Sequence, residues 1–164
     1  MQIDYLVHKS FIGYVLMATT SKGFCWVEIG NSSKKLLADF KKEFVTENIQ
    51  KVARDQNKYF KKLIGYLEGK TEWGKLPFDV ESTDFKMKVW RYMQSIPAGE
   101  VQFYSQIAEA IGKSRSYRAV ASACTTNPVP LVVPCHRVIP RSGGIGEFGP
   151  GKEKKKKLLD KEKL

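Results

Sequence analysis

The segment NPVPLVVPCHRVIP occupies residues 127–140, and its four prolines exclude a regular helix there. Its apolar run delivers Cys135, followed directly by His136, between two prolines. A thiolate is a strong nucleophile, and a neighbouring imidazole or cation lowers the pKa of its thiol. We therefore expect Cys135 to be an activated nucleophile. An isolated Cys-His pair is more often a buried, unreactive thiol beside a hydrogen-bonded histidine, so the surrounding sequence has to decide.

The segment before it, residues 83–125, has the periodicity of three helices. Ser82 or Thr83 is placed to cap the first, which ends before Pro97. A second is expected from a cap at Ser105 to Gly112, and a third from about residue 116 to residue 125. This pattern resembles a helix-turn-helix, although any helical hairpin with a glycine turn shares it. The third helix presents small and basic residues suited to a DNA groove, namely Arg115, Arg118, Ala119, Ser122 and Ala123.

The N-terminal half has a different pattern. Apolar and polar residues alternate in Ile3–Val7, Tyr14–Ala18 and Phe24–Ile29, which predicts an antiparallel sheet. Three- and four-residue spacings then predict two amphipathic helices over about residues 36–52 and 59–67. Glycines and Pro77 interrupt the pattern over residues 68–82, where one short strand is expected at Leu76–Val80. We place the domain boundary there, with an α/β domain at residues 1–78 and a second domain at residues 79–164.

Composition limits the functional classes. The chain has 164 residues, 28 Lys and Arg against 17 Asp and Glu, and a formal net charge of +11. Residues 151–164 alone carry seven lysines, which form either a solvated helix face or a phosphate-binding surface; we expect solvation for the run 154–157. No apolar run or leader predicts a membrane span or a signal peptide, so we expect a soluble intracellular protein with no membrane association. Three scattered cysteines and two histidines favour neither a disulfide framework nor a zinc site.

Taken together, these motifs resemble the O6-alkylguanine-DNA alkyltransferases. The resemblance rests on Pro134-Cys135-His136-Arg137-Val138, the upstream Asn127-Pro128, the glycine-rich loop that follows, and the ending with Leu158, Leu159 and Glu162. It covers residues 83–164, whereas the N-terminal half matches in architecture only. The resemblance implies an α+β fold: an RNase-H-like sheet-and-helix domain followed by a mainly helical domain with a winged helix-turn-helix.

The resemblance also implies roles for individual residues. Cys135 is the alkyl acceptor, His136 is the base that deprotonates it through a water, and Glu162 orients that histidine. Asn127 stabilises the turn near Cys135, and Tyr104 donates a hydrogen bond to guanine N3. Arg118 fills the space left by a flipped base, with Arg115, Ala119 and Ser122 beside it on the duplex. The substrate pocket is expected to include Val138, Phe148, Gly149, Pro150 and Cys124. Leu158, Leu159 and Leu164 are expected to pack the last helix and place Glu162.

The implied activity is DNA repair by irreversible transfer of an alkyl group from O6-alkylguanine in double-stranded DNA. A base inside a duplex cannot reach a side-chain sulfur, so the nucleotide has to be extruded. The product thioether is stable, so each molecule acts once. No cofactor is implied, and we expect a monomer in the cytoplasm, or in the nucleus of a eukaryote. Phe148 stands where the family often has Tyr, and Pro150 where it has a small residue, so the range of adducts stays open, as does O4-alkylthymine.

Two alternatives to a repair protein remain. The first is a DNA-binding regulator in which alkylation of Cys135 serves as a signal. The second is a cysteine hydrolase that uses Cys135, His136 and Glu162 on an acyl group. Turnover separates the hydrolase from the other two, because a hydrolase regenerates its thiol.

Overall fold

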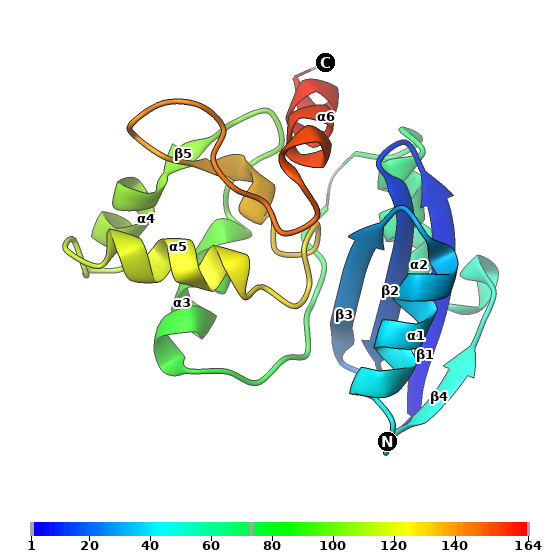
Figure 1. Ribbon diagram of the computed structural model, residues 1–164. Coiled ribbons are helices and arrows are strands. Elements are labelled where there is room, and N and C mark those ends of the chain that lie inside the picture. The colour runs from blue at the N-terminus through cyan, green and yellow to red at the C-terminus, as the bar shows by residue number, and fades with distance from the viewer. Residues whose placement is uncertain (1, 73, 164) are drawn as a thin grey trace. The chain divides into compact units, whose positions relative to one another are not determined.

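The chain forms two units, Met1–Val80 and Glu81–Leu164. The structure is a computed structural model, and it describes residues 2–72 and 74–163. In Figure 1 the first unit combines a sheet with helices, and the second is mainly helical. The predicted α+β class is therefore confirmed.

The N-terminal unit is built on a four-stranded sheet in the order β3-β2-β1-β4. Strands β1 (Gln2–Ser10), β2 (Gly13–Thr20) and β3 (Gly23–Gly30) form the expected antiparallel meander. The fourth strand, β4 (Asn48–Lys51), was not predicted, and it pairs with β1 in parallel. This strand lies inside the range assigned to the first helix, which therefore ends earlier than expected.

Two helices pack on this sheet. The first, α1 (Ser33–Glu43), is capped by the Ser32 side chain, and α2 (Lys58–Leu67) is capped by Asn57, just after the short 3₁₀ turn η1 (Arg54–Gln56). Consecutive strand residues point to opposite faces, and all of residues 15–18 are buried, so both faces of β2 are covered. Leu16 and Ala18 share a cluster with Leu36 and Phe40 of α1.

The end of this unit differs from the prediction in detail. No strand forms at Leu76–Val80; only an isolated bridge joins Phe78 to Phe24. The backbone N–H of Asp79 donates to the Phe24 carbonyl (2.7 Å), and its carboxylate accepts from the Thr20 hydroxyl (2.6 Å). These bonds tie Asp79 to the sheet, and the unit runs to Val80, whereas the sequence placed the boundary after residue 78.

The C-terminal unit begins with α3 (Asp84–Met93), whose first turn is capped by the Thr83 hydroxyl. Helices α4 (Tyr104–Ala110) and α5 (Tyr117–Thr125) then form the expected hairpin around Gly112, which has a φ of 78°. The buried indole N–H of Trp90 donates to the Ala123 carbonyl (2.9 Å) and joins α3 to α5. The expected Ser105 cap was wrong: the Gln106 side chain accepts from the backbone N–H of Phe103 instead.

The remaining elements include the proline-rich segment of residues 127–140. The proline-rich stretch leads into a single 3₁₀ turn, η2 (Cys135–Arg137), and then into β6 (Val138–Ile139). Strand β6 pairs in parallel with β5 (Gln102–Phe103), directly before α4. The last helix is α6 (Lys152–Glu162). Leu158 of α6 is buried, while Leu164, expected to help pack this helix, lies outside the described residues.

Within the described residues, every helix is too short or too polar to span a bilayer.

Candidate active site

Cys135 opens the turn η2 and is buried, with 6% of its surface exposed. Its backbone N–H donates to the Val133 carbonyl (2.8 Å). The Asn127 side-chain amide donates to the same carbonyl (2.9 Å) and to Cys135 Sγ (3.3 Å). The Asn127 side-chain oxygen accepts from the Val129 N–H (2.9 Å), so all its polar atoms are engaged. Asn127 therefore fixes the turn and points a donor at the sulfur, where it favours the thiolate.

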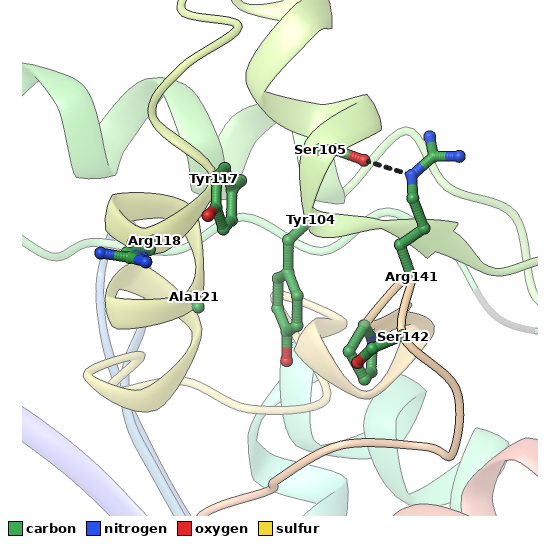
Figure 2. A pocket seen from close by; sticks show the side chains of 8 residues that line it. Tyr104, Ser105, Tyr117, Arg118, Ala121, Arg141 and Ser142 are labelled. Atoms are coloured by element: carbon green, nitrogen blue, oxygen red, sulfur yellow. Dashed lines mark hydrogen bonds between the residues drawn. The ribbon is translucent and has the colours of Figure 1, made fainter.

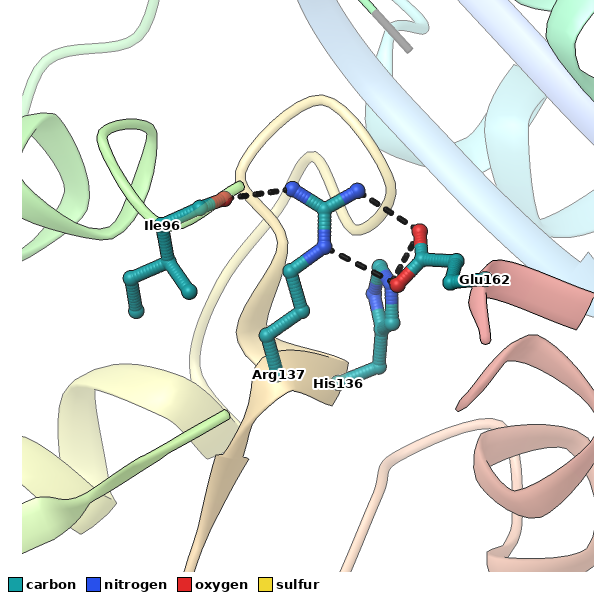
Figure 3. A network of polar contacts seen from close by, with 4 residues as sticks. All are labelled: Ile96, His136, Arg137 and Glu162. Carbon is teal, nitrogen blue, oxygen red and sulfur yellow. Dashed lines mark hydrogen bonds and ion pairs between the residues drawn. The ribbon is translucent and has the colours of Figure 1, made fainter. Parts of the chain in front are cut away.

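His136 and Arg137 converge on one carboxylate from the last turn of α6 (Figure 3). His136 Nε2 lies 3.0 and 3.1 Å from the two Glu162 oxygens. Arg137 donates from Nε (3.0 Å) and Nη2 (2.6 Å) to the same carboxylate, and from Nη1 to the Ile96 carbonyl (2.7 Å). The side chains of all three residues are essentially inaccessible to solvent. The bidentate Arg137 pair keeps a buried anion in place to orient the imidazole.

This geometry selects one tautomer of His136. A carboxylate only accepts hydrogen bonds, so Nε2 carries the proton and Nδ1 carries the lone pair. Nδ1 is buried, and no protein hydrogen-bond partner is recorded for it among the described residues. Burial lowers the pKa of His136 despite the opposing effect of Glu162. The imidazole is therefore neutral at rest, with a free basic nitrogen.

The thiol itself is not acidic at rest. Burial raises the pKa of Cys135, and the Asn127 hydrogen bond and the Lys155 charge offset this only in part. The expectation that the neighbouring imidazole lowers this pKa was wrong, because the imidazole is neutral and desolvation dominates. A buried neutral thiol needs a base to become a nucleophile.

The structure adds a residue that the sequence analysis missed. Lys155 lies within the lysine run 154–157, which was expected to be solvated, yet its side chain is fully buried. Its Nζ donates to the carbonyls of Val138 (2.7 Å) and Glu147 (3.3 Å). Burial lowers the pKa of Lys155, while Cys135 and Cys124 act in the opposite direction. Lys155 lies three and four residues before Leu158 and Leu159, the two leucines of α6, and this spacing was the signal that could have separated it from its neighbours.

A cavity of about 580 Å³ (Figure 2) includes Tyr104 in its lining, but not Cys135 or His136. Its walls come from α4, α5 and the loop after β6, and its lining residues are Tyr104, Ser105, Tyr117, Arg118, Ala121, Pro140, Arg141 and Ser142. Burial, and then the nearby Cys124 and Cys135, raise the pKa of Tyr104 to about 12. Tyr104 is therefore a protonated hydroxyl donor at neutral pH.

The other expected site residues fall into two groups. Arg115, Ala119 and Ser122 are exposed on or just before α5, the helix that also carries Arg118. The prediction that Ala123 faces a DNA groove with them was wrong, because Ala123 is buried against α3. Val138 and Phe148 are buried, and the Phe148 ring meets His136 edge-on with a centroid distance of 6.5 Å. Cys124 is mostly buried and contacts the Met93 sulfur (3.8 Å), and burial raises its pKa.

The glycine-rich loop holds the last two expected positions. Gly149 is exposed, Pro150 is partly exposed, and neither lines the cavity. A side chain at Gly149 would meet no atom within 4 Å.

Among residues 2–72 and 74–163, no group of three or more His, Cys, Asp or Glu side chains is arranged to hold a metal ion.

Comparisons with known proteins give the following similarities. The family profile described as "6-O-methylguanine DNA methyltransferase, DNA binding domain" matches residues 84–164. The chain is 34% identical to a methylated-DNA–protein-cysteine methyltransferase of Methanosarcina barkeri, over 94% of each chain. It is 30% identical to the bifunctional transcriptional activator/DNA repair enzyme Ada of Escherichia coli over 99% of its own length, but spans only about half (46%) of that protein. A crystal structure of Mycobacterium tuberculosis OGT in complex with DNA superposes with a TM-score of 0.80 at 27% identity, covering 99% of this chain and 93% of that one.

Proposed function

Because the chain belongs to the methylated-DNA–protein-cysteine methyltransferase family, we propose that it repairs DNA by transferring the alkyl group of O6-alkylguanine to its own Cys135. The observation that carries the proposal is a buried thiol followed directly, in the turn η2, by a neutral histidine that a carboxylate holds in place. Its substrate is double-stranded DNA that carries this lesion. Activity on O4-alkylthymine is tested in the experiment described below.

The first step is formation of the thiolate. His136 Nδ1 takes the Cys135 proton through a water, and Glu162 stabilises the imidazolium that results. Lys155 and the Asn127 amide stabilise the negative sulfur, since both lower the pKa of the thiol. This transfer turns a neutral thiol and a neutral imidazole into a thiolate and an imidazolium. His136 accepts the proton, while Glu162, Lys155 and Asn127 stabilise the charges that result.

The second step is displacement at the alkyl carbon. The Cys135 sulfur forms a bond to that carbon, the carbon–O6 bond breaks, and its electrons pass to the guanine. The hydroxyl of Tyr104 donates toward guanine N3 and offsets the developing negative charge. The thioether product does not regenerate a thiol, so one molecule repairs one lesion.

DNA engagement is assigned to α5 and the cavity beside it. The exposed Arg115, Ala119 and Ser122 face the duplex, and Arg118 fills the gap left by the extruded nucleotide. One chain holds every group that the reaction uses, so we propose that it acts as a monomer. We also place it in the compartment that holds the DNA: the cytoplasm, or the nucleus of a eukaryote.

The test is intact mass after incubation with an excess of O6-methylguanine duplex. Transfer adds a methylene mass, about 14 Da, to the Cys135 peptide of every active molecule, and Cys135→Ala stays unmodified. Matched duplexes with O4-methylthymine and with undamaged guanine complete the experiment. Modification at Cys124 instead refutes the assignment of the acceptor, and a thiol that is regenerated with repeated turnover points to a hydrolase.

A further inference from the structure

Arg141 is an exposed residue that two contacts hold in one place at the edge of the cavity. It follows Pro140 in the loop after β6, and its Nε donates to the Ser105 hydroxyl (3.3 Å). Its guanidinium carbon also lies over the Phe103 ring, 4.9 Å from the ring centroid. Exposed arginines ordinarily keep most of their rotamer freedom, whereas a stacking contact and a hydrogen bond together restrict this one.

These contacts leave the binding end of the side chain available. They engage Nε and one face of the guanidinium, and no acceptor for the two terminal nitrogens is recorded in the part of the chain that the structure describes. Figure 2 shows these nitrogens directed away from the Tyr104 ring rather than into the cavity. A planar guanidinium with two free N–H groups on one edge matches the geometry of a phosphate.

The surroundings favour an anion. The cavity is lined by two arginines and by no acidic residue. Arg118 lies on the opposite side of Tyr104 from Arg141 in Figure 2, and it also stacks on an aromatic ring, 5.8 Å from the centroid of Tyr117. Two preordered arginines therefore flank the cavity, one on α5 and one on the loop after β6.

We propose that Arg141 binds a DNA backbone phosphate next to the extruded nucleotide. This inference rests on the proposed function, because it is that function that brings an extruded nucleotide to the cavity. The base enters beside Tyr104 while its sugar-phosphate stays at the rim, where the terminal nitrogens of Arg141 point. Phe103 and Ser105 act as positioning residues, because they remove rotamer freedom from Arg141 before DNA arrives.

The first experiment compares the salt dependence of duplex binding for the natural protein, Arg141→Ala and Arg141→Lys. One lost phosphate contact lowers the slope of log affinity against log salt by about 0.9. Arg141→Ala is expected to weaken binding roughly 5- to 30-fold near physiological salt, and Arg141→Lys less, because it keeps the charge and loses the planar edge. The matched control is Arg91→Ala, which removes an exposed arginine of α3 outside the cavity and is expected to keep the natural slope.

The second experiment locates the phosphate. Phosphates around the lesion are replaced one at a time by neutral methylphosphonates, and binding is measured for both proteins. One replacement is expected to weaken the natural protein and to have no further effect on Arg141→Ala, which is the coupling expected of two directly contacting groups. An unchanged salt slope for Arg141→Ala, or the absence of any coupled phosphate, overturns the inference.

Reaction with free O6-benzylguanine keeps this inference separate from the proposed function. That substrate has no phosphate, so Arg141→Ala is expected to lose at least fivefold more rate on the duplex than on the free base. Equal losses on both mean that Arg141 supports the cavity rather than a phosphate. Failure of the natural protein itself to react with both substrates refutes the proposed alkyl transfer instead.

Discussion

Replacing Glu162 by Gln removes the only anion of the buried network formed by His136, Arg137 and Glu162. The carboxylate accepts from Nε and Nη2 of Arg137 and from Nε2 of His136. A Gln side chain has one oxygen that accepts hydrogen bonds and an NH2 group that only donates. At least one of the Arg137 and His136 donors therefore loses its partner. The substitution therefore acts both on the proton transfer from Cys135 and on the fold.

The two effects have different magnitudes. Losing one charge-assisted hydrogen bond to the imidazolium costs about 1.5–3 kcal/mol, which corresponds to roughly 10- to 150-fold in rate. Leaving Arg137 buried without its counter-charge costs about 3–5 kcal/mol of folding free energy. The melting temperature is therefore expected to fall together with the rate, because Glu162 belongs to a buried ion pair.

Single-turnover transfer from O6-methylguanine duplex, measured between about pH 6 and 9.5 below the melting temperature, separates the two effects. The matched control is Leu158→Ala, which empties a buried site on the same helix and costs about 2–5 kcal/mol. Glu162→Gln is expected to be slow at neutral pH and to recover part of its rate at higher pH, where thiolate forms without the base. Leu158→Ala is expected to keep the natural pH profile. Equal rate losses in both variants would refute a direct role for Glu162.

Four further outcomes are expected. Lys155→Met should raise the apparent pKa of the active-site thiol by about one unit and slow transfer roughly tenfold at neutral pH, because a buried cation is lost; alkylation rates against pH measure this, and an unchanged profile contradicts it. Asn127→Asp should slow transfer roughly tenfold and cost about 1–3 kcal/mol in a denaturant titration, since a carboxylate cannot donate to the sulfur. Arg118→Ala should slow duplex repair far more than reaction with free O6-benzylguanine, and equal losses would indicate a role in the fold. Burial lowers the pKa of His136, so the unfolded chain binds more protons below about pH 6.5; calorimetry should show stability lost as the pH falls through that range, and a flat melting temperature would contradict the neutral imidazole.

Local patterns in the sequence located most of the fold. The helix cap at Ser82 or Thr83, the glycine turn at Gly112 and the alternation in the first three strands each depend on neighbouring residues, so the sequence alone predicted them. The structure selects Thr83 as the cap. Strand β4 escaped because it is a short edge strand, Asn48-Ile49-Gln50-Lys51, with mostly exposed side chains. Its existence depends on parallel pairing with residues 2–5, which no local pattern encodes.

The candidate site likewise has features that the sequence predicts and features that only the folded chain shows. The pairing of Cys135 and His136 is visible in the sequence, and the resemblance implied Glu162. The bidentate ion pair between Arg137 and Glu162 joins residues 25 positions apart, and only the folded chain shows it. The direction in which the pKa of the Cys135 thiol shifts also depends on burial. The presence of His136 next to Cys135 in the sequence does not show whether the thiol is buried.

Burial of one lysine inside a cationic run has a consequence for chemical labelling and surface redesign. Amine-reactive reagents are expected to modify the exposed Lys156 and Lys157 while Lys155, between Val138 and Glu147, stays protected. A redesign that neutralises Lys156 and Lys157 to reduce nonspecific binding has to leave Lys155 unchanged. What composition presents as one uniform charged surface is therefore two kinds of lysine, and only one of them is open to change.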